Sequence, residues 1–400
     1  MTHVHRGTWQ PEDRAEAMHR YLPVDVPPGA AGLRVELAYD RGAGVLDLGV
    51  FDPDGRFRGY SGGARNSFAL SANWATPGYL PGELPPGEWQ VFLRLHRVAS
   101  AGVPYEVRAN VGPVAPDAAP DAPPVPGRPE RRDLPTVDGL AWFAGDLHAH
   151  TVHSDGSLTI EELATRAVTT GLDFLAITDH NTVSHHAHLD AVGRRYGLTL
   201  IPGQEVTSDR GHANAFGAIG WVDFRRPAAD WVSTVAERGG LLSVNHPLAA
   251  DYAWRQPLPV KPPLAEVWHS GWWDRTWGAP LAWLLAWAPG TVPVGGSDFH
   301  HPAESVRVGH PTTWVAAASP GVDDVLAALA AGRTAVSESP DGPLLLRVGD
   351  ELVALDADGL LLTDFTGRRR AVRGDRHAFP AAPGAHWLED ERTRIMALSA

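Results

Sequence analysis

Short runs in which apolar and polar residues alternate recur through the N-terminal part of the chain. Apolar side chains occupy every second position in residues 33–39, 89–95 and 105–111, which is the period of a strand with one buried face. Turn-forming residues separate such runs, as in the Asp-Pro-Asp-Gly sequence of residues 52–55. Several short strands joined by such turns predict an all-β sandwich over residues 1–112.

The pattern changes after residue 112. Residues 113–135 contain eight prolines among 23 residues, a composition that favours an extended spacer over a core. Beyond it, short apolar runs such as 172–178 alternate with amphipathic stretches such as 159–170, a pattern typical of βα units in a parallel sheet or barrel. We therefore expect an α/β domain over residues 136–400, in which β patterning returns as a C-terminal extension at about 341–400.

Histidines and carboxylates follow several of these apolar runs. Of the 19 histidines, 13 lie between His148 and His310. His148 and His150 are two positions apart, so on an extended strand both point to one side and can bind one metal ion, although two hydrogen-bonded histidines would fit the same spacing. The other candidates at strand ends are His180, Glu205, His212, His246, Asp298 and His300. Because the carboxyl ends of barrel strands share one mouth, these side chains indicate a multinuclear metal site.

Composition narrows the chemistry of that site. The chain has no cysteine, so disulfides, thiolate ligands and cysteine nucleophiles are excluded and any metal must be bound by His, Asp or Glu. Imidazole and carboxylate ligands suit Zn, Mn or Fe. The net charge of −13 disfavours nucleic acid as a partner. Since no targeting signal or membrane-spanning run is evident, we expect a soluble, cytoplasmic protein with a small-molecule substrate.

The metal-ligand motifs resemble those of the PHP (polymerase and histidinol phosphatase) domain. The matching residues are His148-Ala149-His150, Ser154-Asp155-Gly156, Thr178-Asp179-His180-Asn181, Glu205, His246 and Ser297-Asp298-Phe299-His300. The resemblance implies a distorted (β/α)7 barrel that holds two or three divalent metal ions. It implies that one ion is held by His148, His150, Glu205 and Asp298, a second by Glu205, His246 and His212, and a third or alternative second by Asp155, His180 and His300.

Two further resemblances bear on this assignment. Four segments resemble the CehA/McbA-like metallohydrolases: Glu205-Val206-Thr207, the Gly211–Asn214 motif, the Glu266-Val267-Trp268 strand and the Ala331–Ser337 segment. The amidohydrolase superfamily is the alternative barrel, because it also opens with His-x-His but often bridges its metals with a carboxylated lysine. The only lysine here, Lys261, lies in a proline-rich loop, so Glu205 is the better bridge and the PHP domain is favoured.

Metal ions of this kind activate water. A water that bridges two cations is a hydroxide nucleophile near neutral pH, and the cations stabilise charge on the attacked oxygen. We therefore expect a metal-dependent hydrolase of small phosphoesters, with Glu205, His212 and His301 as candidate catalytic residues and His301 as a possible proton donor. Aryl ester or carbamate hydrolysis of the CehA/McbA type is the alternative, and a non-catalytic metal-binding module is a third reading.

The sequence indicates the substrate-contacting residues less clearly than it indicates the metal ligands. Trp272 and Trp273 lie in a loop-like segment that predicts either an aromatic wall at the mouth of the site or peripheral packing. Arg210 and Arg307 lie near ligand motifs and would bind phosphate, unless they are surface charges. Among the remaining histidines near the motifs, His153 is expected either in a supporting or surface position or in a catalytic role. The others, His185, His186 and His188, are expected to be solvated.

Overall fold

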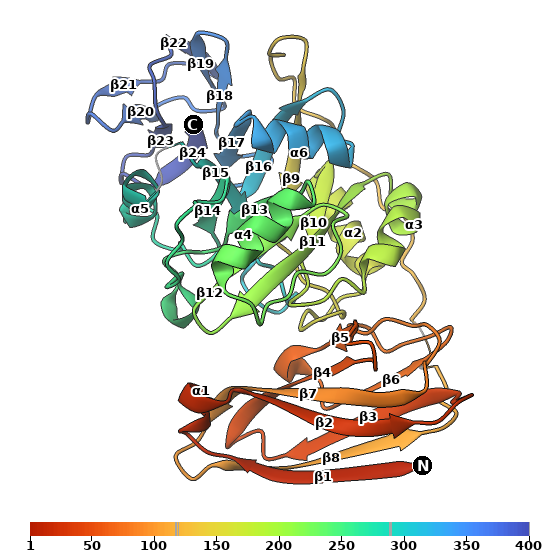
Figure 1. Ribbon diagram of the computed structural model, residues 1–400. Coiled ribbons are helices and arrows are strands. Elements are labelled where there is room, and N and C mark those ends of the chain that lie inside the picture. The colour runs from red at the N-terminus through yellow and green to blue at the C-terminus, as the bar shows by residue number, and fades with distance from the viewer. Residues whose placement is uncertain (117, 119, 288–289, 400) are drawn as a thin grey trace. The chain divides into compact units, whose positions relative to one another are not determined.

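The computed structural model describes residues 1–116, 118, 120–287 and 290–399, and its chain divides into two compact units (Figure 1). The first unit comprises Met1–Asp121 together with two short segments, Val152–Gly156 and Asp179–Ala187. The second unit comprises Ala122–Thr151, Ser157–Thr178 and His188–Ala400. Strands dominate both units, and the helices are concentrated in the second, so the protein has a mixed α/β fold.

The first unit contains two four-stranded antiparallel sheets. One has the order β1 (Thr2–Trp9), β8 (Val103–Val111), β3 (Gly32–Tyr39) and β6 (Ser67–Ser71), and the other has the order β2 (His19–Val26), β7 (Gly87–Val98), β4 (Gly44–Phe51) and β5 (Phe57–Tyr60). The helical elements are α1 (Asp13–Glu16) and the 3-10 turn η1 (Gly62–Ala64). Alternate residues such as Leu33, Val35 and Trp89 are fully buried in one core, so the predicted strands at 33–39, 89–95 and 105–111 are confirmed.

The second unit is built on a mixed sheet of 13 strands. Their order is β15 (Val292–Gly296), β14 (Leu264–His269), β13 (Leu241–Val244), β12 (Gly211–Phe216), β11 (Thr199–Ser208), β10 (Phe174–Ile177), β9 (Ala141–Asp146), β16 (Thr312–Ala317), β17 (Thr334–Ser337), β24 (Ile395–Ser399), β23 (His386–Glu389), β20 (Leu361–Asp364) and β21 (Arg369–Ala371). A separate small sheet consists of β18 (Leu344–Val348), β19 (Glu351–Leu355) and β22 (Arg376–Pro380). Strands from the far C-terminal part of the chain therefore extend the sheet that carries β9.

The sheet is not parallel throughout, as the alternation of strands and helices had suggested. Strands β9, β10 and β11 are parallel, and so are β13, β14 and β15, but β12 runs antiparallel to both of its neighbours. Only two residues, Asp209 and Arg210, connect β11 to β12, and a connection of that length can join only antiparallel strands. The hairpin reverses the direction of the chain, so the first residues of β12 lie beside the carboxyl end of β11.

Helices in the second unit are short. They are α2 (Ile160–Thr170), α3 (His186–Tyr196), which begins at the end of the first unit's second segment, α4 (Ala228–Glu237), α5 (Ala279–Trp287) and α6 (Val322–Ala330), with the 3-10 turn η2 (Ala250–Tyr252). The predicted apolar face of α2, which includes Ile160, Leu163 and Val168, is buried in the core. Within the described part of the chain, no helix is long and apolar enough to span a membrane.

Part of the proline-rich segment is held against the second unit. Arg128 donates to the backbone oxygen of Gly197 at 3.0 Å, and Arg132 binds the Asp356 carboxylate at 2.6 Å. Arg131 forms an ion pair with the Asp173 carboxylate. These arginines bind the segment to the surface of the second unit, because guanidinium groups donate to backbone carbonyls and to carboxylates.

Candidate metal centre

The first group of predicted ligands meets just beyond the end of β9. His148 and His150 are fully buried, and their Nε2 atoms are 3.1 Å apart. His148 Nε2 lies 3.3 Å from Glu205 Oε1 and 3.1 Å from Asp298 Oδ1. His150 Nε2 lies 3.0 Å from Asp298 Oδ1 and 3.6 Å from Glu205 Oε2. Four side chains that the PHP resemblance assigned to one metal ion therefore turn their ligand atoms toward one another.

A second group shares Glu205 with the first. Glu205 Oε1 lies 3.3 Å from His246 Nε2 and 3.1 Å from His212 Nδ1. His212 reaches this carboxylate because it is the second residue of the antiparallel strand β12, close to the hairpin turn, where it pairs with Thr207 of β11. The structure thus brings both predicted partners of Glu205 to it.

His269 joins this second group, although the sequence analysis did not single it out. Its Nε2 lies 3.0 Å from Asp298 Oδ2, and one ligand atom each from His246, His269 and Asp298 falls within 4.8 Å of the others. The signal was available in the sequence, because His269 is the last residue of β14 and strand ends are where the other candidates lie. It was missed because the apolar run before it was interpreted only as a strand.

Glu266 and Asn245 hold the ligand side chains in place. Glu266 Oε1 lies 3.0 Å from His148 Nδ1, while its Oε2 accepts the backbone N–H of His246 at 2.9 Å. Asn245 Nδ2 donates to Glu205 Oε1 at 2.8 Å. Because one ring nitrogen of His148 is engaged by Glu266, the other is left to face the ligand group. A side chain at Gly296 would prevent this arrangement, since its Cβ would lie 2.3 Å from Glu266 Oε1.

Two of the ligand residues have backbone conformations that non-glycine residues seldom adopt. The φ angle is 27° at His246 and 54° at Asp298, in the left-handed region where a Cβ atom is crowded. The surrounding hydrogen bonds hold these conformations, because the Asp298 N–H donates to the His148 carbonyl at 2.8 Å. Strain of this kind is concentrated at functional sites.

Neighbouring groups of opposite charge strongly shift the pKa values of a buried imidazole and a buried carboxylate. Burial by itself lowers the pKa of His148, but the carboxylates of Asp298, Glu266 and Glu205 outweigh it and hold that pKa well above its ordinary value. Burial raises the pKa of Asp298, yet the imidazole of His148 and hydrogen bonds from two further histidines bring it well below the usual range. Burial lowers the pKa of His246 to about 4, so this imidazole is neutral and can donate a lone pair at physiological pH.

The donor set fits divalent metal ions. Among the residues that the structure describes, the buried Nδ1 atom of His246 has no hydrogen-bond partner, which is costly unless a ligand satisfies it. Imidazole nitrogens and carboxylate oxygens, without thiolates, are the donors that Zn, Mn and Fe accept. The arrangement can therefore hold metal ions at His148, His150, Glu205, His246 and Asp298, with His269 and His212 beside them.

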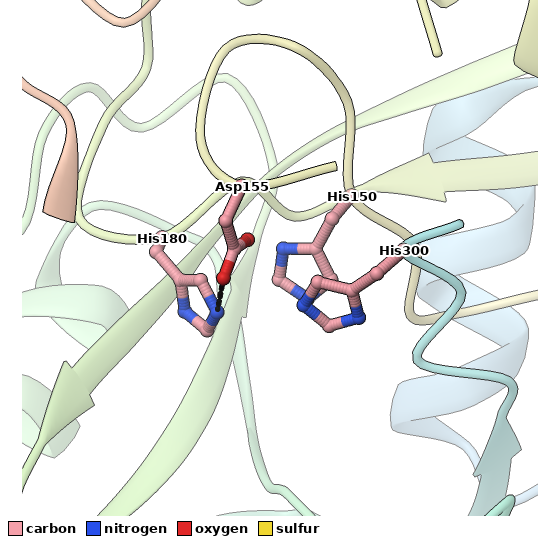
Figure 2. A group of neighbouring side chains, drawn as sticks. All are labelled: His150, Asp155, His180 and His300. Atoms are coloured by element: carbon pink, nitrogen blue, oxygen red, sulfur yellow. Dashed lines mark ion pairs between the residues drawn. The ribbon is translucent and has the colours of Figure 1, made fainter. Parts of the chain in front are cut away.

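The predicted ligands of a further ion lie in two pairs (Figure 2). In the first unit, Asp155 Oδ2 lies 3.6 Å from His180 Nε2, and both side chains are partly exposed. In the second unit, the ring of His300 stacks on that of His150 with 4.1 Å between the centroids. The assignment of Asp155, His180 and His300 to one ion remains a prediction.

The histidines beside these motifs have defined partners. His185 is fully buried, with Nδ1 3.2 Å from Asp179 Oδ2, so the expectation that it is solvated is wrong. This expectation rested on the family motif ending before His185, and the motif does not show that the Asp179 carboxylate within it pairs with this imidazole. His153 is also buried, and its Nδ1 lies 2.8 Å from Ser184 Oγ. His186 is half-buried and His188 is exposed.

The candidate substrate-contacting residues are mostly at the surface. Arg210 is exposed and donates to the Arg255 carbonyl at 3.2 Å, Arg307 is exposed, and exposed His301 accepts the Ala303 N–H at Nδ1. Trp273 is 85% exposed. Trp272 is buried instead, and it lines a cavity of about 30 Å³ beside His246 and His269.

Short stretches of the chain are similar to known proteins. A stretch of 65 residues is 48% identical to the 5'-3' exoribonuclease Rnm of Escherichia coli (strain K12), covering 16% of this chain and 22% of that protein. A stretch of 63 residues is 36% identical to phosphoribosyl 1,2-cyclic phosphate 1,2-diphosphodiesterase of Eggerthella lenta, covering 16% of this chain and 24% of that protein. The chain thus spans less than a quarter of the length of either relative.

Among solved structures, a two-domain protein of Bacteroides vulgatus described as containing a predicted PHP-like metal-dependent phosphoesterase is 18% identical. The comparison has a TM-score of 0.45 and covers 68% of this chain and 99% of that one. The curated relatives are phosphodiester-cleaving enzymes by name, and they support the expectation of a hydrolase. In its motif-bearing part, residues 146–246, the chain matches the PHP domain that its sequence motifs predicted.

Proposed function

We propose that the protein is a divalent-metal-dependent phosphoesterase that hydrolyses small phosphoesters. The observation that carries this proposal is the convergence of His148, His150, Glu205 and Asp298, with ligand atoms 3.0 to 3.6 Å apart in a buried group. Unpaired buried charges are costly, so a cluster of carboxylates and imidazoles is retained where it binds an ion or reacts. The PHP match over residues 146–246 supports the same function.

The ligand residues would divide into overlapping sets. One ion would be held by His148, His150, Glu205 and Asp298, a second by Glu205, His246 and His212 with His269 adjacent, and a third by Asp155, His180 and His300. Metal ions held by these residues would supply activation of water and stabilisation of negative charge on the attacked phosphoryl oxygen. Glu205 is the residue common to the first two sets, which makes it the proposed bridge.

The remaining side chains orient these groups and handle protons. Glu266 would accept a hydrogen bond from His148 Nδ1–H, which leaves His148 Nε2 as the ligand atom, and Asn245 fixes the rotation of the Glu205 carboxylate. His301 accepts the Ala303 N–H at Nδ1, so its neutral form carries the proton on Nε2. We assign protonation of the leaving-group oxygen to the imidazolium form of His301, which would return to this neutral form as it gives up the proton.

The proposal extends to the fold of the two domains and to the cellular location of the enzyme. The parallel strand sets around β9–β11 and β13–β15 support a distorted (β/α)7 barrel, and the two sheets of the first unit, which share one core, support a β-sandwich. Residues 113–135 would connect the two domains. The acidic net charge and the absence of a membrane-spanning helix in the described residues support a cytoplasmic enzyme for small molecules.

The substrate class is open to direct test, and two alternatives have specific support. The exposed Trp273 favours aryl esters or carbamates as a second candidate, because its indole can stack on an aromatic ring. Rnm of Escherichia coli, named an exoribonuclease, favours a nucleic-acid substrate, whereas the net charge of −13 opposes binding of a polyanion.

The decisive experiment assays the purified protein, with added Mn or Zn, on four substrates. These are 4-nitrophenyl phosphate, bis(4-nitrophenyl) phosphate, a 1-naphthyl carbamate and a short oligoribonucleotide. We expect metal-dependent hydrolysis of the phosphoesters and a loss of roughly a hundredfold or more in kcat/KM in Glu205→Gln. Glu237→Gln, which changes an exposed glutamate of α4, is the control. Failure to bind Mn or Zn would refute the proposal, and preferred cleavage of the carbamate or the oligoribonucleotide would replace the substrate class.

A further inference from the structure

A turn of the first unit contacts both segments that carry Asp155 and His180. This turn, Thr76–Tyr79, lies between β6 and β7 and is closed by a hydrogen bond from the Tyr79 N–H to the Thr76 carbonyl at 2.9 Å. The two segments, Val152–Gly156 and Asp179–Ala187, are far from it in sequence but belong to the same compact unit. Contacts within this unit therefore determine how these two candidate ligands are held.

Gly78 makes the central contacts of the turn. Its N–H donates to Ser184 Oγ at 3.0 Å, and its carbonyl accepts from Thr182 Oγ1 at 2.8 Å. The same carbonyl accepts the N–H of Tyr60 at 3.1 Å, which ties the turn to the end of β5. Arg65 donates to the Val152 carbonyl, so the other segment is attached as well.

The approach of the backbone at Gly78 leaves no room for a side chain. Its φ is +99°, and a Cβ atom would lie 2.8 Å from the carbonyl oxygens of His153 and Tyr60. Both atoms belong to the backbone, so neither can move aside as a flexible side chain would. Any residue other than glycine would therefore have to push the segment containing His153 away from the turn.

The two segments are also joined to each other immediately before the candidate ligands. Ser154 Oγ donates to Asp179 Oδ1 at 2.6 Å, and both side chains are buried. Since Asp155 follows Ser154 and His180 follows Asp179, this bond fixes the two backbones from which the carboxylate and the imidazole project. Their ligand atoms lie 3.6 Å apart.

We propose that the Thr76–Tyr79 turn of the N-terminal unit positions Asp155 and His180 as a pair of metal ligands. The inference rests on the proposed metal-dependent function, and it gives the N-terminal unit a role in that function. Gly78, Thr182 and Ser184 are positioning residues, because they act through the loop backbones rather than by contact with the ion. The N-terminal unit is thereby required for full metal loading as well as for stability.

The test measures metal ions per chain in the full-length protein after saturation and desalting. Asp155→Ala defines the loss expected when one of the two ligands is removed, and Gly78→Ala should show the same loss of one ion while the other ions are retained. The double variant should lose no more than either single variant, because both changes act on one site. The matched control is Gly55→Ala, whose φ of +73° is equally left-handed but whose Cβ would have no neighbour within 4 Å.

Two milder variants keep the test sound if Gly78→Ala fails to fold. Thr182→Val and Ser184→Ala each remove one hydrogen bond to Gly78 without adding bulk, and each should weaken binding of that ion by roughly tenfold or more in a chelator competition. Unchanged affinity for every ion in these two variants, or retention of all ions in Asp155→Ala, would overturn the proposal, and so would loss of every ion together. This result can be distinguished from a failure of the proposed function. If Gly78→Ala loses one ion but the wild-type protein hydrolyses none of the four substrates, the hydrolase is refuted and the positioning role stands.

Discussion

At the scale of single residues, Glu266 joins two parts of the metal centre. One carboxylate oxygen engages His148 Nδ1 and the other accepts the His246 N–H. In Glu266→Gln one of these oxygens becomes an N–H2 group, so one of the two bonds is lost together with the negative charge. We expect the affinity for metal to fall by roughly tenfold to a hundredfold, measured as the dissociation constant in competition with a chromophoric chelator.

The matched control for this change is again Glu237→Gln, an exposed glutamate. Circular dichroism should show that both variants keep their secondary structure. A dissociation constant in Glu266→Gln equal to that of the wild type would mean that Glu266 only packs against the ligands and does not orient them.

Single residues also show what the sequence could and could not predict at this site. The spacing of His148 and His150 followed from the geometry of an extended strand, and the structure brings their Nε2 atoms to 3.1 Å. The roles of His269 and Glu266 could not be derived from the sequence, because they depend on which strands are neighbours in the sheet. His185 was misjudged because its partner, Asp179, lies six residues away in an irregular loop, where no periodicity indicates contact.

At the scale of elements, α2 was predicted almost to the residue because its signals are local. Thr159 caps the helix by accepting the Glu162 N–H at 3.2 Å, and the Glu162 side chain accepts the Thr159 N–H at 2.8 Å. This capping box satisfies two backbone donors that the first turn leaves free. The direction of β12, by contrast, could not be derived from its apolar pattern, since alternation has the same period in parallel and antiparallel strands.

The capping box leads to a test of stability. Thr159→Ala removes the acceptor for the Glu162 N–H and should reduce the free energy of unfolding by about 1 kcal/mol, seen as a lower urea midpoint in circular dichroism. Thr169→Ala, in the exposed last turn of the same helix, should change it by about 0.5 kcal/mol or less. Equal midpoints for the two variants would show that the cap does not stabilise the folded protein.

At the scale of the whole molecule, composition marks a proline-rich segment at residues 113–135, but it does not show which segments belong to each of the two units. Segments 152–156 and 179–187 lie within the α/β part of the sequence, yet by contacts they belong to the first unit. A composition shift detects only contiguous pieces of chain. The contacts of Gly78 with Ser184 and Thr182 join residues more than a hundred positions apart, and nothing in the local pattern signals such pairs.

The first unit contains two fully buried tyrosines whose phenols are held in the neutral form. Tyr60 donates to Asp47 Oδ2 at 2.5 Å, and Tyr79 donates to the Leu48 carbonyl at 2.9 Å. Burial is the main cause that raises the pKa of both, and the Asp47 carboxylate raises that of Tyr60 further. The folded unit therefore keeps these protons at a pH where an unfolded chain, with tyrosine pKa values near about 10, releases them.

This difference predicts the alkaline stability of the protein. Below about pH 10 both states hold the protons and stability is complete, whereas at higher pH only the unfolded state ionises, so each tyrosine costs up to about 1.4 kcal/mol per pH unit. Urea midpoints measured between about pH 8 and about pH 11 should therefore fall steeply in the wild type and less steeply in Tyr79→Phe. Tyr21→Phe, which removes an exposed phenol of the same unit, is the control. If Tyr79→Phe and the wild type lose stability with the same slope, ionisation of this buried phenol is not what limits the folded state at high pH.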